Sequence, residues 1–172
     1  MGIVQQTMGF RFQDALNLTA AETVQQFGFA MMLSGAGSLF SQAVIVQRLS
    51  VPPFTLLRMA IPLLIVAFLI MAVMNTQFML TVAMVILGLS MGLAGPGFMA
   101  GASLAVAPEE QGAVAGVAGS CAPLGFTLGP LLGGLKDQYD PTLPYSFAAG
   151  LYVILLLCMQ WLGRRVQVHH EV

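Results

Sequence analysis

Charged side chains are scarce in this sequence of 172 residues. Asp, Glu, Lys and Arg make up 8% of the chain, whereas an ordinary soluble domain contains about 25%. Hydrophobic residues make up 58%, so a soluble chain of this composition could not cover its surface with polar groups. We therefore expect a lipid bilayer to be its solvent. The net charge of −1 argues against nucleic acid as a partner, because that partner calls for clustered Lys and Arg.

Cysteine and histidine are also rare, which limits the chemistry. The two cysteines, Cys121 and Cys158, lie in apolar runs, where we expect packing rather than a disulfide framework. The stretch 88–92 has the Gly-x-Ser-x-Gly spacing of serine hydrolases, but no histidine lies near Ser90 in the sequence and no strand is expected before it. The sequence thus predicts no enzyme activity, no metal site and no cofactor.

Five long apolar segments dominate the chain instead. They cover about residues 24–46, 55–74, 77–99, 113–135 and 143–162. A transmembrane helix needs about 20 apolar residues, and each segment meets this length. Short polar connections with prolines make neighbouring helices antiparallel. The expected fold is an all-α integral membrane protein, with a polar segment at 1–22, a five-helix transmembrane bundle at 23–163 and a tail at 164–172.

The polar segment 1–22 allows two readings. Its first ten residues are either the last turns of an earlier, truncated helix that leads into an outer loop, or an ordinary polar tail. Basic residues are unevenly divided between the two sides of the membrane, with Arg48, Arg58, Arg164 and Arg165 on one side and Arg11 and Lys136 on the other. Because the side with more basic residues faces the cytoplasm, we expect the C-terminal tail to be cytoplasmic.

Glycines recur at helical spacing in the fourth span. Gly125, Gly129 and Gly133 are four residues apart and share one helix face, next to Pro130 and Gly134. Without side chains there, a neighbouring helix can approach until the backbones touch. This contact is either static packing or a smooth surface on which two helices rock.

The third span repeats the pattern. Gly88 and Gly92 are four residues apart, and Gly95-Pro96-Gly97 follows them. Because proline lacks a backbone N–H and its ring clashes with the preceding turn, we expect the helix to break or kink there. Interrupted helices in membranes usually line a cavity.

A polar stripe runs along the first span. Gln26, Ser34, Ser38 and Gln42 are separated by multiples of four residues and lie on one helix face. Since polar side chains avoid lipid, this face should meet other helices or a watery pathway. Two readings stay open, namely hydrogen bonds between helices and contact with a transported substrate.

Two acidic residues, Glu109 and Glu110, follow Pro108 at the start of the fourth span. Proline and acids in the first turn stabilise a helix N-terminus, and this role alone accounts for them. The alternative is a cytoplasmic gate in which they pair with Arg48. No charged residue lies deep in any span, so a titratable group for proton coupling would have to lie elsewhere.

Three stretches resemble the major facilitator superfamily, in particular its drug:proton antiporter and tetracycline-resistance-like branch. Pro108-Glu109-Glu110-Gln111-Gly112 before a glycine-rich span is similar to that branch's entry to its eleventh helix. Residues 125–134 are similar to the antiporter motif of the fifth helix, whose counterpart is the eleventh, and residues 12–22 resemble the loop after the seventh. By this resemblance the chain corresponds to the end of helix seven through helix twelve of a twelve-helix fold.

The resemblance implies a secondary active transporter that exports small molecules, coupled to protons, by alternating access in the inner (plasma) membrane. Its expected partners are the bilayer, a small-molecule substrate, and either the missing N-terminal half or another copy of the chain. Because alternating access needs two halves, we expect the chain alone to be inactive. The alternative is a small membrane scaffold or regulatory subunit that binds other helices.

Overall fold

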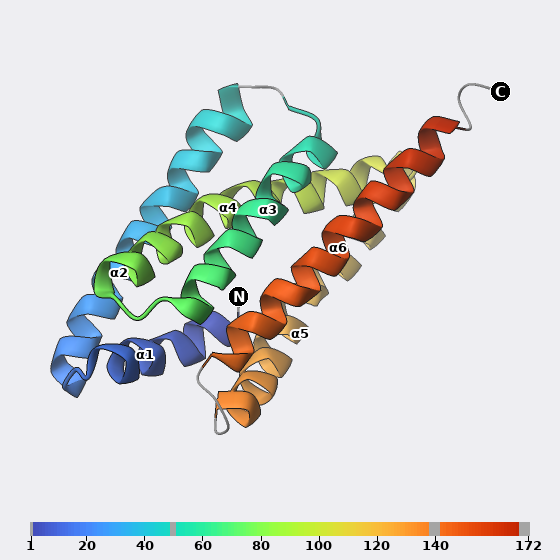
Figure 1. Cartoon of the computed structure of the whole chain (residues 1–172). Coiled ribbons are helices and arrows are strands. Elements are labelled where there is room, and N and C mark those ends of the chain that lie inside the picture. The colour runs from blue at the N-terminus through green and yellow to red at the C-terminus, as the bar shows by residue number, and fades with distance from the viewer. Residues whose placement is uncertain (1, 49–50, 138–141, 169–172) are drawn as a thin grey trace.

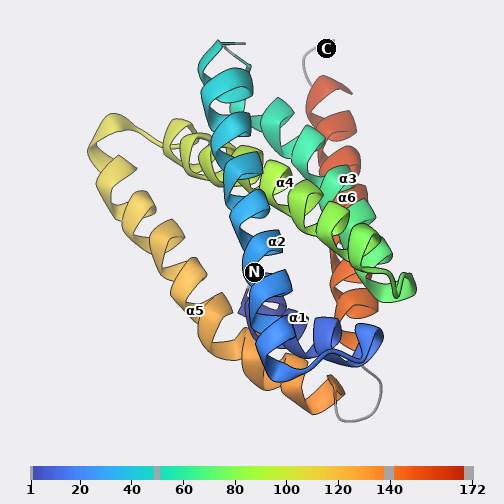
Figure 2. The same ribbon diagram turned by 90° about the vertical axis from the view of Figure 1, so that its left-hand side faces the viewer.

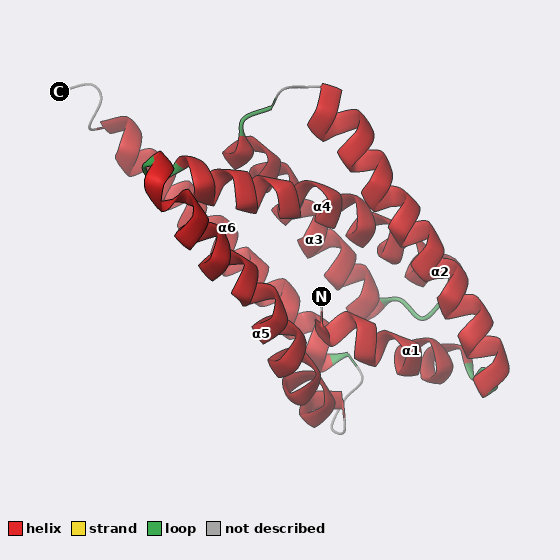
Figure 3. Cartoon of the chain, turned by 180° about the vertical axis from the view of Figure 1, so that it is seen from behind, coloured by secondary structure: helices red, strands yellow, loops and turns green. Residues whose placement is uncertain are grey.

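The computed structural model describes residues 2–48, 51–137 and 142–168, and every regular element in these residues is helical (Figures 1 and 3). In chain order the elements are α1 (Gly2–Leu16), α2 (Ala20–Phe40), the π-helix η1 (Ser41–Val46), α3 (Pro53–Val73), α4 (Gln77–Leu104), the 3₁₀ turn η2 (Pro108–Glu110), α5 (Gln111–Asp137) and α6 (Leu143–Val168). The expected all-α fold is confirmed for the described part of the chain.

Each expected apolar span coincides with a long helix. Within the described residues, four stretches are long and apolar enough to cross a membrane: Ala20–Val46, Pro53–Val73, Gln77–Leu104 and Leu143–Trp161. The remaining helix, α5, has 27 residues. At 1.5 Å per residue such a helix is about 40 Å long, which exceeds the hydrocarbon core of about 30 Å.

From α2 to α6, successive helices run in opposite directions (Figures 1 and 2). The end of η1, the start of α3 and the turn η2 lie at the same end of the bundle as the last turns of α6. Local signals set the helix starts. Thr19 and Glu22 form a capping box before α2, and the Thr76 hydroxyl accepts a hydrogen bond from Met79 N before α4. The alternating direction of successive helices agrees with the antiparallel neighbours expected from the short connections.

Helix α1 lies across the opposite end of the bundle and is buried along one face. Met8 and Phe12 have no exposed surface, and the ring centroid of Phe12 lies 5.8 Å from that of Phe27 in α2. Of the two readings for this segment, the described residues therefore form a packed helix rather than a polar tail.

The connection after α1 is shorter than the resemblance implied. Residues 12–16 belong to the helix, so only residues 17–19 separate α1 from α2. The helix ends because Asn17 adopts a left-handed conformation with a φ of 50°. Leu18 N then donates to Gln13 O at 3.1 Å, which is the hydrogen bond of a Schellman helix end.

Two clusters of buried apolar side chains hold the helices together. The larger one joins α1, α2, α3, α4 and α6 and includes Met8, Ala30, Phe68, Leu80 and Tyr145. The smaller one is centred on Leu56, Ala60 and Leu93, between α3 and α4. Among the described residues, α5 contributes to neither cluster, and Figure 2 shows it along one side of the molecule. The compact part of the bundle therefore consists of the other helices.

Candidate functional site

Helices α2 and α4 approach each other until their backbones touch. A Cβ atom placed on Gly88 would overlap the carbonyl oxygen of Ser34, and one on Gly92 would overlap that of Ser38. The serine and the glycine of each pair recur after four residues, so small residues face each other over two turns. In lipid, where apolar side chains gain little by leaving the solvent, such close packing is a main source of helix association. A gating role for the two glycines stays a prediction.

Backbone carbonyls accept the hydrogen bonds of two serines near this contact. Ser41, the first residue of η1, donates from Oγ to Leu89 O of α4 at 2.9 Å. Ser90 donates from Oγ to Ile86 O of its own helix at 2.6 Å. Both serines are fully buried. The hydrogen bond of Ser41 ties the π-helix to α4, and π-helical segments occur often at functional sites.

The predicted polar stripe of α2 divides between two environments. Ser34 and Ser38 lie against α4, whereas Gln42 is exposed and donates from Nε2 to Ser38 Oγ at 3.3 Å. Gln26 is half-buried, and its Oε1 is covered without a hydrogen-bond partner among the described residues. The geometry favours helix contact for the two serines. The substrate pathway stays a prediction, with the two glutamines as its polar groups.

The expected break at Gly95-Pro96-Gly97 is absent, because α4 runs unbroken from Gln77 to Leu104. A proline removes one backbone hydrogen bond, and in a membrane bundle neighbouring groups can make up for that loss. A Cβ atom on Gly97 would lie 3.1 Å from Pro53 O of α3, whereas one on Gly95 would meet nothing within 4 Å. Of the two predicted outcomes, the break was therefore wrong and the kink stays a prediction. Helix α4 packs between α2 and α3.

The glycines of α5 face open space wherever their surroundings are described. A Cβ atom on Gly125 would have no neighbour within 4 Å, so the close contact expected there is not made within the described part of the chain. Gly112, Gly116 and Gly119 are equally open. Gly129, Pro130, Gly133 and Gly134 lie outside the residues whose side chains the structure describes, and their contact with a neighbouring helix stays a prediction.

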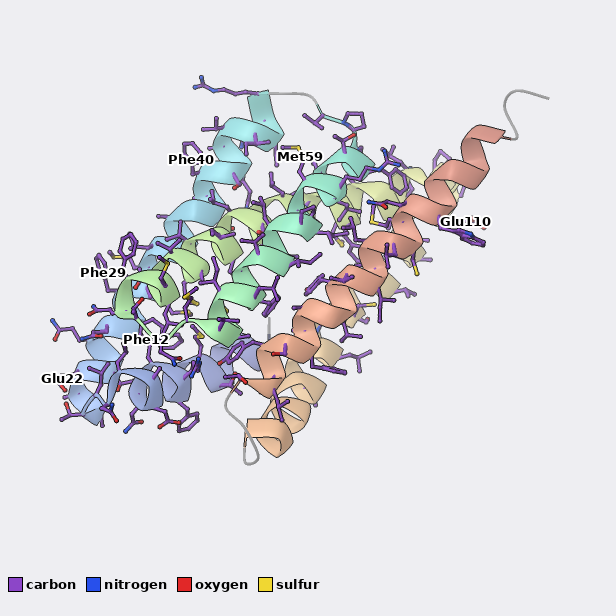
Figure 4. The ribbon with its side chains drawn as sticks, in the orientation of Figure 1. Phe12, Glu22, Phe29, Phe40, Met59 and Glu110 are labelled. Atoms are coloured by element: carbon purple, nitrogen blue, oxygen red, sulfur yellow. The ribbon has the colours of Figure 1, made fainter. Side chains whose placement is uncertain are left out.

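Arg48, Glu109 and Glu110 are all exposed. Among the described residues, none of their side chains forms an ion pair or hydrogen bond with another. The two glutamates lie in η2, which leads directly into α5, so the role at a helix N-terminus fits their position. Figure 4 shows Glu110 at the edge of the molecule, opposite the corner that holds Glu22. The cytoplasmic gate stays a prediction.

Arg11 is a buried cation whose environment the sequence did not reveal. Only 6% of it is exposed, and its guanidinium donates to the carbonyl oxygens of Met71, Ala72 and Met74 and to Asn75 Oδ1. These acceptors form the C-terminal end of α3, where the last carbonyls lack partners within the helix and the helix dipole favours a positive charge. The one signal for this burial in the sequence is that Arg11 shares a helix face with the apolar residues Met8 and Phe12.

The fold and the contacts describe a helical membrane protein with closely packed small residues and few charges. A family model for the Major Facilitator Superfamily matches residues 2–171. The chain therefore belongs to this superfamily of membrane transporters. No curated protein and no solved structure matches it.

Proposed function

We propose that this chain is the C-terminal half of a secondary transporter that exports small molecules by alternating access, coupled to protons. It lies in the inner membrane with its C-terminal tail in the cytoplasm, and it works only with further helices. Two amides on one continuous helix carry the proposal. Gln26 Oε1 in α2 is covered without a hydrogen-bond partner among the described residues, and Gln42 in η1 is exposed and donates to Ser38 Oγ of α2 at 3.3 Å.

These amides are costly in hydrocarbon. An amide that leaves water for an apolar medium without a partner costs roughly 2–7 kcal/mol, so Gln26 Oε1 and the exposed atoms of the Gln42 amide need water, a substrate or polar partners. They lie 16 residues apart on one helix, which corresponds to about 24 Å along its axis. Polar side chains at two such depths suit a pathway that runs through most of the bilayer.

Two further observations support the need for partner helices. Gly112, Gly116 and Gly119 of α5 share one helix face on which a Cβ atom would meet no neighbour within 4 Å, and another helix could approach this face closely. In addition, the four stretches that qualify as membrane spans contain no acidic residue away from their ends. The titratable group that proton coupling requires would then come from the partner helices.

The test measures whether water reaches the stripe. In a chain with Cys121→Ser and Cys158→Ser, we would introduce Gln42→Cys, Leu39→Cys or Val44→Cys singly and expose membranes to a charged, impermeant thiol reagent. Leu39 and Val44 are exposed and bracket Gln42 in depth. We expect rapid reaction at position 42, slow reaction at both controls, and slower reaction at 42 in the presence of hydrophobic cationic drugs.

Equal rates at all three positions would show that the stripe borders no aqueous pathway, and the transporter proposal would fail. Rapid reaction at position 42 that no drug slows would favour the scaffold reading, in which the stripe contacts another protein.

A further inference from the structure

The π-helix η1 interrupts one long helix near its end. It follows α2 without a break, and residues 47 and 48 continue from it as α-helix (Figure 1). The backbone N–H of Gln47 donates to Gln42 O, five residues back, whereas the bonds of an α-helix span four residues. The turn therefore holds one residue more than an α-helical turn. Because the α-helix is the usual form of a continuous helix, contacts from outside should hold this wider turn.

These contacts come from α4 and from the smaller apolar cluster. Ser41 is fully buried and donates from Oγ to Leu89 O of α4 at 2.9 Å. A Cβ atom on Gly92 would lie only 2.8 Å from Ser41 Cβ, so the two helices touch at this point. At the other end of η1, Ile45 and Val46 both pack against the smaller cluster. The first residue and the last two residues of the π-turn are thus held on one side of the helix.

An α-helix through the same residues would point its end in another direction. Positions i, i+4 and i+7 share one face of an α-helix, so Arg48 would join Ser41 and Ile45 on the buried side. Val46 would turn away from the cluster, because one residue of an α-helix corresponds to a rotation of roughly 100°. The structure has the opposite arrangement, with Val46 half-buried and Arg48 exposed. The extra residue in η1 therefore decides which way Arg48 points.

We propose that η1 is a two-state joint, π-helical while Ser41 is bonded to Leu89 O and α-helical once that bond is broken. The hydrogen bond joins α2 to α4, so a displacement of one helix against the other breaks it. The joint then converts this displacement into a rotation of Arg48 by roughly 100°. Ser41 is the positioning residue of this device, which does not depend on a transport activity.

The experiment reads the direction of the helix end from thiol reactivity. The full chain, with Cys121→Ser and Cys158→Ser, carries either Arg48→Cys or Val46→Cys and reacts in membranes with a small uncharged thiol reagent. Position 48 should react rapidly and position 46 slowly, because Arg48 is exposed and Val46 is half-buried. With Ser41→Ala, the ratio of the rate at 48 to the rate at 46 should fall about three- to tenfold, which is the shift in equilibrium that one buried hydrogen bond gives.

Two controls separate rotation from general loosening. Ser90→Ala removes the hydroxyl of another fully buried serine, which donates to Ile86 O of its own helix, so the ratio should stay unchanged. Deletion of Ala43 removes the extra residue, so η1 becomes α-helical while its end keeps its direction. The deletion alone should therefore leave the ratio unchanged. Combined with Ser41→Ala, it should restore the ratio of the chain with Ser41.

Three results would overturn the proposal. An unchanged ratio in a folded Ser41→Ala chain would show that the hydrogen bond does not hold the π-turn. Equal falls with Ser41→Ala and Ser90→Ala would show that the bundle has loosened without a rotation. A reversed ratio after deletion of Ala43 alone would show that η1 holds no extra residue, and this last measurement decides the matter even where Ser41→Ala does not fold.

Discussion

Arg11 is the residue whose replacement should change the stability of this chain most clearly. Its Nε donates to Met71 O at 3.3 Å, and its Nη2 donates to Ala72 O, Met74 O and Asn75 Oδ1 at 3.5, 3.3 and 2.6 Å. One cation thus fastens α1 to the C-terminal end of α3. Arg11→Met keeps an unbranched side chain in the same space and removes all four hydrogen bonds.

The magnitude follows from these contacts. Three of them are long and contribute little, whereas a short hydrogen bond between a charged and a polar group contributes about 1.5–3 kcal/mol. The charge at the helix C-terminus adds up to about 2 kcal/mol. We expect Arg11→Met to lower the free energy of unfolding by about 3–4 kcal/mol. Arg11→Lys should cost about half as much, because it keeps the charge but not the planar set of donors.

The assay is unfolding of the chain in mixed micelles with increasing SDS, followed by circular dichroism. Asn75→Ala alone should cost about 1–2 kcal/mol, and together with Arg11→Met it should cost less than the sum, because the two share a bond. Arg48→Met is the control, since Arg48 is exposed and should change stability by at most about 0.5 kcal/mol. If Arg11→Met and Arg48→Met shift unfolding equally, the guanidinium does not hold α1 to α3.

Three further experiments test other parts of the structure and of the proposed function. Gly88→Ala should lower the free energy of unfolding by about 1–3 kcal/mol, because its methyl group overlaps α2. Gly95→Ala is the control, since position 95 faces open space and the change should cost no more than about 0.5 kcal/mol. Equal effects of the two changes would contradict the close contact. Reporter fusions at Asn75 should lie outside the cell and fusions after Val172 inside, and fusions reporting the same side would refute the orientation. Vesicles that contain only the purified chain should show no efflux of fluorescent drugs under a proton gradient, and gradient-driven efflux that Gln42→Leu blocks would instead indicate a transporter built from copies of this chain.

The membrane helices could be predicted from the sequence because lipid imposes a simple requirement on composition and length. A span must be apolar for about 20 residues, so each helix is visible in the sequence alone. The end of α4 was placed too early, near residue 99. The helix continues to Leu104 instead, through residues that are mostly small and apolar.

The contacts between helices could be predicted only in part. Small residues at intervals of four indicated close packing, but nothing in the sequence paired Gly88 with Ser34 or left Gly125 without a neighbour. The contacts of Arg11 are harder still to predict, because its partner Asn75 lies 64 residues away in the sequence. The helix face that Arg11 shares with Met8 and Phe12 hints at its burial, but nothing in the sequence identifies its acceptors.

The open glycines of α5 lead to a last prediction, which separates folding from assembly. If the face at Gly125 serves a helix outside this chain, Gly125→Leu should leave the unfolding of the chain within about 0.5 kcal/mol of the unchanged protein, because a side chain there meets nothing. In membranes, the same change should weaken cross-linking of α5 to partner helices through Cys121, whereas the thiol of Cys158 on α6 should cross-link as before. A loss of stability of more than about 1 kcal/mol would show that this face already packs within the chain, and a stable variant with unchanged cross-linking would show that it meets lipid alone.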